Sequence, residues 1–401
     1  MSVAVDFKHV DIIFGKDIPG ALKMVDAGSN RAEILAKTGS VLGAADANLT
    51  VNEGQISVLM GLSGSGKSTL LRAVNGLNKV ARGQVLVKDS DRMVDVASCD
   101  PNTLRHIRQK QVAMVFQQFA LLPWRTVREN VGFGLELAGV PEPEIKERVD
   151  RQLKLVGLDT WANKHVHELS GGMQQRVGLA RAFATDAPIL LMDEPFSALD
   201  PLIRTKLQDE LLQLQKRIKK TIIFVSHDLD EAMRIGDRIA IMQDGVVVQV
   251  GTPEEIVMQP ANDYVRSFFR NVDVSHVFRA GDIARHSQLT LIDRAGLSVN
   301  AALEQMRSHD RDVAIVVARD KRFQGMVSAE SLREAVRSGG PDPYHRAFLP
   351  DTAPIEADTP LCQVMGRVAE SRWPVPVVDG RGRYLGAISK SSLLMTLDRA
   401  A

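Results

Sequence analysis

The chain has 401 residues, 44% of them hydrophobic and 25% charged, and its 50 basic and 49 acidic residues give a net charge of +1. Such a composition is ordinary for a globular protein of two or three domains, and the balanced charge gives no general reason to bind nucleic acid or an anionic membrane. Cys99 and Cys362 lie in different halves of the chain, so we expect neither a disulfide framework nor a cysteine metal site, as is usual in a reducing cytoplasm.

Three short apolar runs predict buried parallel strands, at residues 56–60, 189–192 and 221–225. The segment between the last two runs has apolar residues at helical spacing, at Leu207, Leu211, Leu214 and Ile218. The fold class is therefore α/β, with helices covering a parallel sheet. In such sheets ligands bind at the carboxyl ends of the strands, where polar residues follow each run.

Residues 61–69, GLSGSGKST, fit the phosphate-binding pattern G-x-x-x-x-G-K-[ST] and are called the P-loop below. The segment lies directly after the first predicted strand and before a helical pattern, which is the context that the motif requires. The glycines let backbone N–H groups surround phosphates, and the helix N-terminus adds its dipole. Lys67 would reach the terminal phosphates, and the Ser68 hydroxyl would ligate Mg²⁺. The residues expected to hold the nucleotide are Gly61, Ser63, Gly64, Ser65, Gly66, Lys67, Ser68 and Thr69.

Two further segments with polar groups follow. Gln117, after the apolar start of MVFQQFALLPW, is placed to reach the metal and the attacking water, although on its own it reads as a surface amide. In LSGGMQQR, residues 169–176, Ser170 and the amides of Gly171 and Gly172 precede a helical pattern. That arrangement favours an anion but has no lysine or Mg²⁺ ligand of its own. An incomplete second cradle makes sense if a partner chain supplies the nucleotide.

The remaining candidates follow the second and third predicted strands. Asp193 is expected to hold Mg²⁺ through its water shell, and Glu194 to orient or deprotonate the water that attacks the γ-phosphate. A solvated strand end is the alternative for this pair. His227 is placed to bond the γ-phosphate, although a lone histidine is usually structural. Asp200, before Pro201, is a nucleotide-site candidate whose alternative is a simple helix cap.

The order GLSGSGKST, Gln117, LSGGMQQR, ILLMDEP, SALD and SHD resembles the ATPase subunit of an ABC transporter, over roughly residues 5–260. The resemblance implies a RecA-like core with a helical subdomain at about 118–182 and a homodimer that binds ATP and Mg²⁺. In that dimer Ser170, Gly171, Gly172 and Asp200 of one protomer would close over the ATP held by the other. The implied catalytic residues are Lys67, Gln117, Glu194 and His227, and the implied metal ligands are Ser68, Gln117 and Asp193.

A helical insertion at about residues 20–45 and the segments DPNTLRH and DEPFSALDPLIR narrow the resemblance. They are similar to importers of quaternary amines, and we expect choline-type members to be nearest. The implied function is to power choline uptake, and the alternative is an osmoprotectant importer for glycine betaine and proline, regulated by ionic strength or nucleotide. Phe14 aligns with the aromatic residue on which the family stacks adenine, with a core phenylalanine as the alternative.

The same resemblance implies partners and a location. Integral-membrane permease subunits would meet the loop at Gln117, and an extracytoplasmic substrate-binding protein would act indirectly. The chain would then lie peripherally at the cytoplasmic face of the plasma membrane. The rival class is an ABC-type ATPase that works on nucleic acid. A single cassette without sustained heptads or a basic patch disfavours that class, so we expect no nucleic acid partner.

We expect an ATPase domain at 1–270 and a second domain at 271–401, in which the sequence repeats with a period of 61 residues. The matching pairs are Val316 with Val377, Gly325 with Gly386, Ser328 with Ser389 and Leu332 with Leu393. The repeats, at about 280–340 and 341–399, resemble a tandem pair of CBS domains of α+β type, a module that often binds adenine nucleotides. Ser331 and Ser392 replace the aspartate that commonly holds ribose there. This half is either a regulatory sensor or a dimerisation module.

Overall fold

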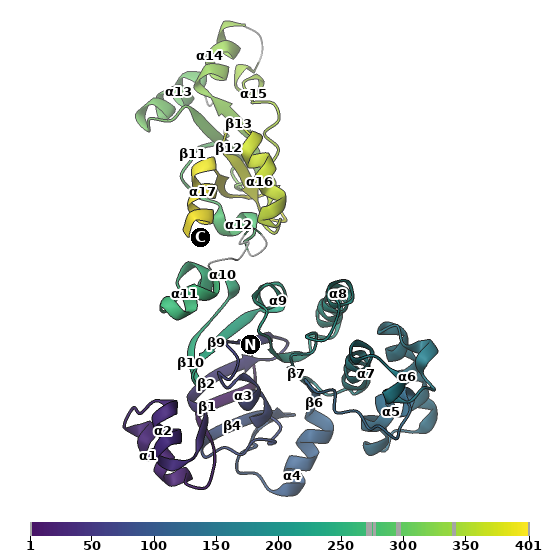
Figure 1. Ribbon diagram of the computed structural model, residues 1–401. Helices are drawn as coiled ribbons and strands as arrows, with labels where there is room; N and C mark the ends of the chain where they lie inside the picture. The colour runs from purple at the N-terminus through teal and green to yellow at the C-terminus, as the bar shows by residue number, and fades with distance from the viewer. Residues whose placement is uncertain (1, 270–274, 276–277, 294–297, 339–341, 400–401) are drawn as a thin grey trace. The chain divides into compact units, whose positions relative to one another are not determined.

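The computed structural model describes residues 2–269, 275, 278–293, 298–338 and 342–399 (Figure 1). The chain divides into two compact units, Met1–Arg266 and Ser267–Ala401. The expected boundaries at 270/271 and at 340/341 lie outside the described residues. Among the helices of the described parts, none combines the length and the apolar character that crossing a bilayer requires.

The main sheet of the first unit has the strand order β10-β9-β3-β8-β7-β6. Its strands are β3 (Ile56–Met60), β6 (Val112–Val115), β7 (Ile189–Asp193), β8 (Thr221–Val225), β9 (Arg238–Gln243) and β10 (Val246–Gly251). Only β10 is antiparallel to its neighbour. Every residue of β3, β7 and β8 is buried, because helices or a second sheet cover both faces of a parallel sheet. The three predicted strands are confirmed.

A second, antiparallel sheet in the same unit has the order β2-β1-β4-β5. Its strands are β1 (Val3–Phe14), β2 (Val41–Asn52), β4 (Arg82–Asp89) and β5 (Arg92–Asp95). Apolar side chains from the two sheets share one core, in which Phe7 and Val85 belong to the same cluster as Leu59 and Leu191. The second sheet thereby supports the strand that leads into the P-loop.

Helices flank the main sheet and form a separate group beyond β6 and β7 (Figure 1). The flanking elements are α3 (Lys67–Ala73), α4 (Pro101–His106), η1 (Ile107–Gln111), α8 (Pro201–Ile218), α9 (Leu229–Ile235), α10 (Pro253–Met258) and α11 (Asp263–Phe269). The separate group contains α5 (Val127–Leu137), α6 (Glu142–Leu155), η2 (Asp159–Trp161), η3 (Val166–Glu168) and α7 (Gly171–Ala184). The helices α5, α6 and α7 contact one another, so this group packs together.

The helical part of the insertion before the P-loop ends earlier than predicted. It forms α1 (Ile18–Asp26) and α2 (Arg31–Thr38), and Asn30 caps α2 with Glu33 in a capping box. Gly39, at φ +65°, ends α2 in the left-handed conformation that favours glycine. Residues 41–45, expected to be helical, instead begin β2, because α2 has ended at Gly39 and Val41, Leu42 and Ala44 pair with β1.

The second unit contains two three-stranded sheets, with orders β11-β12-β13 and β14-β15-β16. The first repeat comprises α12 (Ala280–Ile283), β11 (Leu289–Ile292), α13 (Val299–Ser308), β12 (Val313–Val317), β13 (Phe323–Ser328) and α14 (Ala329–Arg337). The second comprises α15 (Pro343–Arg346), β14 (Ile355–Glu356), α16 (Leu361–Glu370), β15 (Val375–Val378), β16 (Tyr384–Ile388) and α17 (Lys390–Arg399). The matching element order confirms the predicted strand, turn, strand and helix in each copy.

The repeat extends to individual hydrogen bonds. Val316 pairs with Gly325 in one sheet, as Val377 pairs with Gly386 in the other. The sheets are joined by two reciprocal bonds, in which the Phe323 N–H donates to the Gly382 carbonyl at 3.0 Å and the Tyr384 N–H donates to the Lys321 carbonyl at 2.9 Å. The short first helix of each repeat packs on the opposite half, because α12 contacts β16 and α15 contacts α14. The two halves are therefore one folded body.

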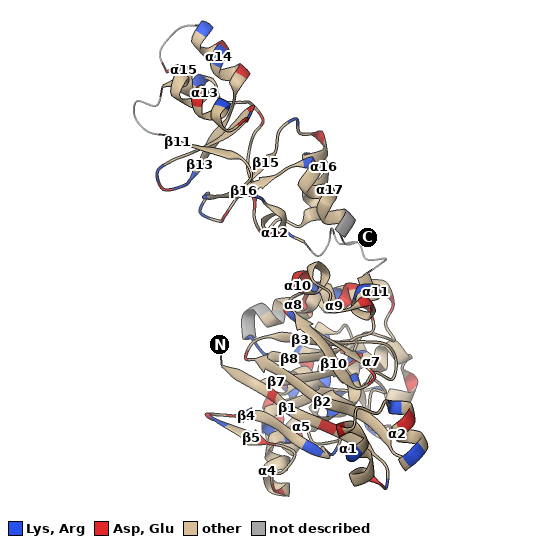
Figure 2. Ribbon diagram, turned by 90° about the vertical axis from the view of Figure 1, so that its left-hand side faces the viewer, with Lys and Arg blue, Asp and Glu red and all other residues tan. Residues whose placement is uncertain are grey.

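Charged residues of both signs alternate along the outer helices of both units (Figure 2). For example, α2 carries Arg31, Glu33 and Lys37, and α14 carries Glu330 and Arg333. Such interleaving is typical of solvated helix faces and agrees with the near-zero net charge.

Candidate nucleotide site

The P-loop connects β3 to α3 and requires glycine at two positions. At Gly61, with φ +148°, a Cβ atom would lie 2.2 Å from the Met242 carbonyl oxygen. At Gly66, with φ +101°, a Cβ atom would lie 2.3 Å from the Gly43 carbonyl oxygen. Backbone from β9 and β2 therefore approaches the loop so closely that only glycine fits.

The Lys67 ammonium is folded back onto the P-loop. Its Nζ atom donates to the carbonyls of Gly61 at 2.8 Å and Leu62 at 2.9 Å. Burial lowers the pKa of Lys67, and the nearby Glu194 and Asp193 carboxylates partly offset that effect. A bound phosphate would offer this amine an anionic acceptor in place of neutral carbonyls.

Beside Lys67, two of the three predicted metal ligands meet. The Ser68 hydroxyl donates to Asp193 Oδ1 at 2.6 Å, and Asp193 is fully buried at the end of β7. The Arg72 guanidinium donates to Asp193 Oδ2 through Nη2 at 2.8 Å and Nε at 3.2 Å. A hydroxyl and a carboxylate are oxygen ligands of the kind that Mg²⁺ prefers, so these residues fit that ion.

Side chains that follow three neighbouring strands meet at Glu194. Its carboxylate Oε2 accepts from Gln117 Nε2 at 3.1 Å and lies 3.4 Å from His227 Nδ1. Gln117 follows β6, Glu194 follows β7 and His227 follows β8, so their side chains meet at the carboxyl edge of the sheet. Glu194 has φ +47°, which is uncommon for a residue with a Cβ atom. The structure thus brings together three of the four predicted catalytic side chains.

Gln175 holds the unusual backbone of Glu194, and sequence reasoning did not single it out. Its Nε2 donates to the Glu194 carbonyl at 3.0 Å, and its Oε1 accepts from the Ala198 N–H at 3.0 Å. The Gln175 side chain is buried. The signal available in the sequence was its position inside LSGGMQQR. This segment therefore supports Glu194 in its own chain, in addition to the role across a dimer that the sequence predicts for it.

The other cradle is built from helix caps in this chain. The Ser170 hydroxyl caps α7 by accepting from the Met173 N–H at 3.4 Å, and Gly171 and Gly172 are the first residues of that helix. Asp200 caps α8 by accepting from the Ile203 N–H at 3.0 Å. The alternative role proposed for Asp200, a helix cap, is therefore observed. Gly171 and Gly172 at the start of α7 leave its N-terminal amides free of bulky side chains.

Phe14 lies at the edge of the P-loop helix. A Cβ atom on Gly43 would be 2.8 Å from both the Phe14 ring and the Thr69 methyl group, so these two side chains flank Gly43. Phe14 is 43% exposed, which contradicts the alternative that it is a core phenylalanine. An exposed ring beside the P-loop is suited to stacking on a flat base.

Two contacts that the sequence did not reveal support the middle of the P-loop, between Ser63 and Gly66. Arg31, on α2 of the insertion, donates to the Gly64 carbonyl. The Gly245 N–H, in the turn between β9 and β10, donates to the Ser65 carbonyl at 3.0 Å. No pattern in the local sequence links these distant residues to the loop, since both contacts arise only on folding.

Comparison with known proteins identifies the family. The ABC transporter family matches residues 44–197. Over its whole length the chain is 50% identical to the glycine betaine/proline betaine transport system ATP-binding protein ProV of Salmonella typhimurium, of which it covers 98%. It is 42% identical, over 98% of its length and 92% of the relative, to the glycine betaine transport ATP-binding protein OpuAA of Bacillus subtilis. The choline transport ATP-binding protein OpuBA of Bacillus subtilis is 34% identical over 86% of the chain and 90% of the relative. Special nearness to choline-type members is therefore not supported.

A solved structure described as a dimeric structure of MJ0796, a bacterial ABC transporter cassette, has a TM-score of 0.54 and 31% identity to this chain. The match covers 62% of this chain and 98% of the chain of that cassette. The same protein was solved as a dimer in a post-hydrolysis state bound to ADP and Pi, with a TM-score of 0.54 and 32% identity. The chain belongs to the ATP-hydrolysing, ATP-binding subunits of ABC transporters, within the group that includes these betaine and choline transport proteins.

Proposed function

We propose that this chain works as a homodimer that hydrolyses MgATP to power the import of a quaternary amine. The chain itself does not contact the transported molecule. The observation that carries the proposal is the meeting of Gln117, Glu194 and His227 at the sheet edge that also bears the P-loop. The full-length similarity to betaine transport proteins supports the transport role.

The proposed division of labour follows the contacts. Lys67 would leave the loop carbonyls to bind the terminal phosphates, while Phe14 stacks on the adenine. Ser68 and Asp193 would hold Mg²⁺, helped by Gln117, and the ion would supply charge neutralisation at the phosphates. Glu194 would accept a proton from the attacking water, and His227 would hold the γ-phosphate. Gln117, which donates to Glu194, would release that carboxylate as it turns to the metal.

The dimer is proposed because the cradle at Ser170 is incomplete. It offers a hydroxyl and helix amides, but the lysine and the metal ligands lie on the P-loop side of the same fold. A second copy turned head to tail would place Ser170, Gly171, Gly172 and Asp200 against its partner's ATP. The similar cassette known as a dimer supports this arrangement.

A groove beside the loop at Gln117 suits the permease. It encloses about 390 Å³, and its lining includes Phe116, Phe133, Leu77 and Leu137, of which the last two are half exposed. Arg181, at the same groove, donates to the carbonyls of Phe119 at 3.0 Å and Ala120 at 2.7 Å in the loop after β6. We propose that an apolar helix of the permease lies here, because pressure on this loop would reach Gln117 directly.

Trp124 belongs to the same segment. It is 71% exposed and is therefore not a packed core tryptophan. An exposed tryptophan is typical of residues that anchor protein interfaces, which supports a role in the contact with the permease.

The proposed substrate is glycine betaine or proline betaine, with choline as the second candidate. The higher identity to the betaine proteins favours the first pair, whereas the sequence segments quoted above favoured choline. The chain would act at the cytoplasmic face of the membrane, and the external binding protein would select the substrate.

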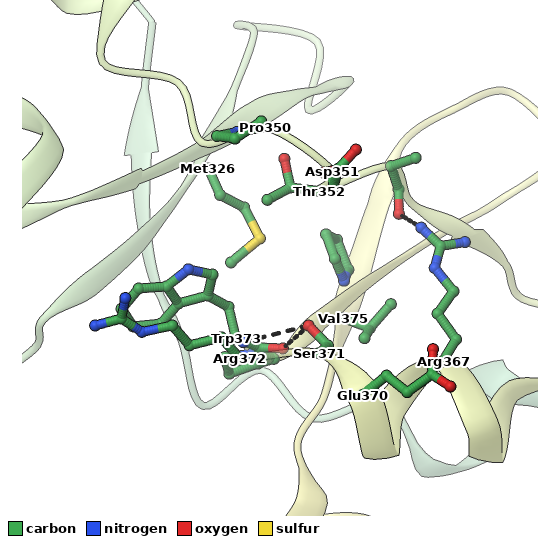
Figure 3. A pocket seen from close by; sticks show the side chains of 13 residues that line it. Met326, Pro350, Asp351, Thr352, Arg367, Glu370, Ser371, Arg372, Trp373 and Val375 are labelled. Carbon is green, nitrogen blue, oxygen red and sulfur yellow. Dashed lines mark hydrogen bonds between the residues drawn. The ribbon is translucent and has the colours of Figure 1, made fainter.

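The second unit is proposed to be a CBS-type regulatory module. A cavity of about 370 Å³ lies between its repeats, bounded by Met326, Thr352, Arg367 and Trp373 (Figure 3). The Arg372 guanidinium lies 4.7 Å from the centre of the Trp373 ring, which gives the cavity an aromatic and cationic wall. Such a wall suits a flat, anionic ligand such as a nucleotide.

The serines expected at the ribose position have local partners. Ser331 Oγ accepts from the Ser328 N–H, and Ser392 Oγ accepts from the Ser389 N–H, both at 2.9 Å. Both hydroxyls are therefore used in hydrogen bonds at the first turn of a helix, α14 or α17. We propose that any nucleotide here is held through Arg367 and Trp373 instead.

The test is ATPase activity of the complete transporter in liposomes, with its permease and binding protein, in the presence of glycine betaine, proline betaine or choline. Stimulation by the betaines above that by choline supports the first candidate. Stimulation by choline alone supports the second. Equal rates with and without all three compounds would contradict the transport proposal.

A further inference from the structure

The hydroxyl of Tyr264 lies at the base of the P-loop. It accepts a hydrogen bond from the Leu62 N–H at 3.3 Å and donates one to the Met242 carbonyl at 3.1 Å. Tyr264 is on α11, and the first unit ends within this helix, two residues later at Arg266. A residue far along the chain thus reaches the loop that is expected to hold phosphates.

The two partners of this hydroxyl are the backbone segments that meet at Gly61. The Met242 carbonyl is the group that a Cβ atom on Gly61 would strike. The Gly61 carbonyl, which belongs to the same peptide group as the Leu62 N–H, accepts from the Lys67 ammonium at 2.8 Å, so this peptide, called the Leu62 peptide below, is bound at both of its polar ends. Moving Tyr264 would therefore shift the peptide on which the lysine rests.

We propose that Tyr264 is a positioning residue for the P-loop, whose hydroxyl keeps the Leu62 peptide and the Met242 strand end at the separation that phosphate binding needs. The inference rests on the proposed nucleotide site and names a residue outside every motif of that site. Burial raises the pKa of Tyr264, so its hydroxyl stays a neutral donor near neutral pH.

Tyr264 lies two residues before the end of the first unit. The chain continues from α11 into the second unit, so a displacement of α11 would be transmitted to the Leu62 peptide without passing through any catalytic side chain. The hydroxyl thus joins the P-loop to α11, the helix in which the first unit ends.

The test is the full-length Tyr264→Phe variant, which removes one oxygen and keeps the ring. Loss of two hydrogen bonds at the loop should raise KM for ATP about 3- to 10-fold and leave kcat within about twofold of wild type. The matched control is Tyr384→Phe, because the Tyr384 hydroxyl is buried and has no hydrogen-bond partner among the described residues. That control should leave KM unchanged.

A KM within about 1.5-fold of wild type would overturn the proposal, even if the thermal midpoint fell, because a purely structural hydroxyl would change stability alone. Should the variant not fold, amide hydrogen exchange of the wild-type protein decides. The Leu62 N–H is expected to be protected, and rapid exchange there would overturn the proposal. Wild-type protein without ATPase activity would instead contradict the proposed function.

Discussion

The Ser68 hydroxyl donates a 2.6 Å hydrogen bond to the Asp193 carboxylate, although the two residues lie 125 positions apart in the sequence. The other Asp193 oxygen accepts from Arg72, so the buried carboxylate is satisfied by two groups on α3. An ion entering between Ser68 and Asp193 would have to replace the first of these bonds. This relationship leads to two predictions.

The Ser68→Ala variant should need more Mg²⁺. Removing one oxygen ligand should raise the Mg²⁺ concentration for half-maximal ATPase activity about tenfold, equivalent to about 1.4 kcal/mol. A magnesium titration at saturating ATP measures this shift. The control is Ser63→Ala, which changes a serine of the same loop that is not among the expected metal ligands. It should leave the Mg²⁺ concentration for half-maximal activity unchanged. Identical midpoints for Ser68→Ala and wild type would rule out Ser68 as a ligand.

The Arg72→Met variant should be less stable without nucleotide. It leaves the Asp193 carboxylate buried without its cation, and since Arg72 is partly exposed we expect a loss of about 2 kcal/mol in the free energy of unfolding. Urea denaturation measures the loss. The control is Arg151→Met, which breaks an exposed ion pair with Glu147 and should cost less than about 0.5 kcal/mol. Equal losses in the two variants would contradict the special role of Arg72.

The Gln175→Leu variant should slow hydrolysis more than it weakens binding. It removes the donor to the Glu194 carbonyl and the acceptor for Ala198, so Glu194 is no longer held in its left-handed conformation. We expect kcat to fall about tenfold or more while ATP affinity changes less than about threefold. Single-turnover hydrolysis and equilibrium ATP binding separate the two effects. A variant with normal kcat and weak ATP binding would show that Gln175 does not position the base.

Glu231 gives a prediction about pH. Burial raises the pKa of its carboxyl above the ordinary value of 4.5, and the bonds from Ser226 and Gln208 only partly oppose this. Because the native carboxyl binds its proton more tightly than the unfolded one, its contribution to stability is lost as pH rises from 4.5 through the raised pKa. Glu231→Gln removes this loss, so its stability relative to wild type should improve between acidic and neutral pH. Urea unfolding over that range measures it, and a constant difference would contradict the prediction.

The first unit was predictable where neighbours in sequence are neighbours in space. The strands at 56–60, 189–192 and 221–225 and the loop between β3 and α3 follow from local pattern, and the parallel-sheet rule then places Glu194 near His227. Arg72 and Gln175 escaped prediction because a polar residue in a helix pattern does not reveal which distant carboxylate or carbonyl it meets. The helical insertion was extended too far because residues 41–45 become a strand by pairing with β1, and the local sequence does not show that partner.

The second unit shows the same limit. The period of the sequence predicted the strands and the equivalence of Val316 with Val377 and of Gly325 with Gly386, and the two equivalent pairs take the same register in their sheets. The exchange of α12 and α15 between the halves was not predictable, because it depends on which apolar face each short helix finds after the chain has folded.

The most direct test of the account is ATP hydrolysis by the full-length Glu194→Gln variant. The variant keeps the shape of the side chain and removes the proposed base, so hydrolysis should fall by about 10²- to 10⁴-fold while ATP binding persists and the ATP-bound dimer accumulates. Hydrolysis within about threefold of wild type would contradict the assignment of Glu194, and with it the site at the edge of the sheet.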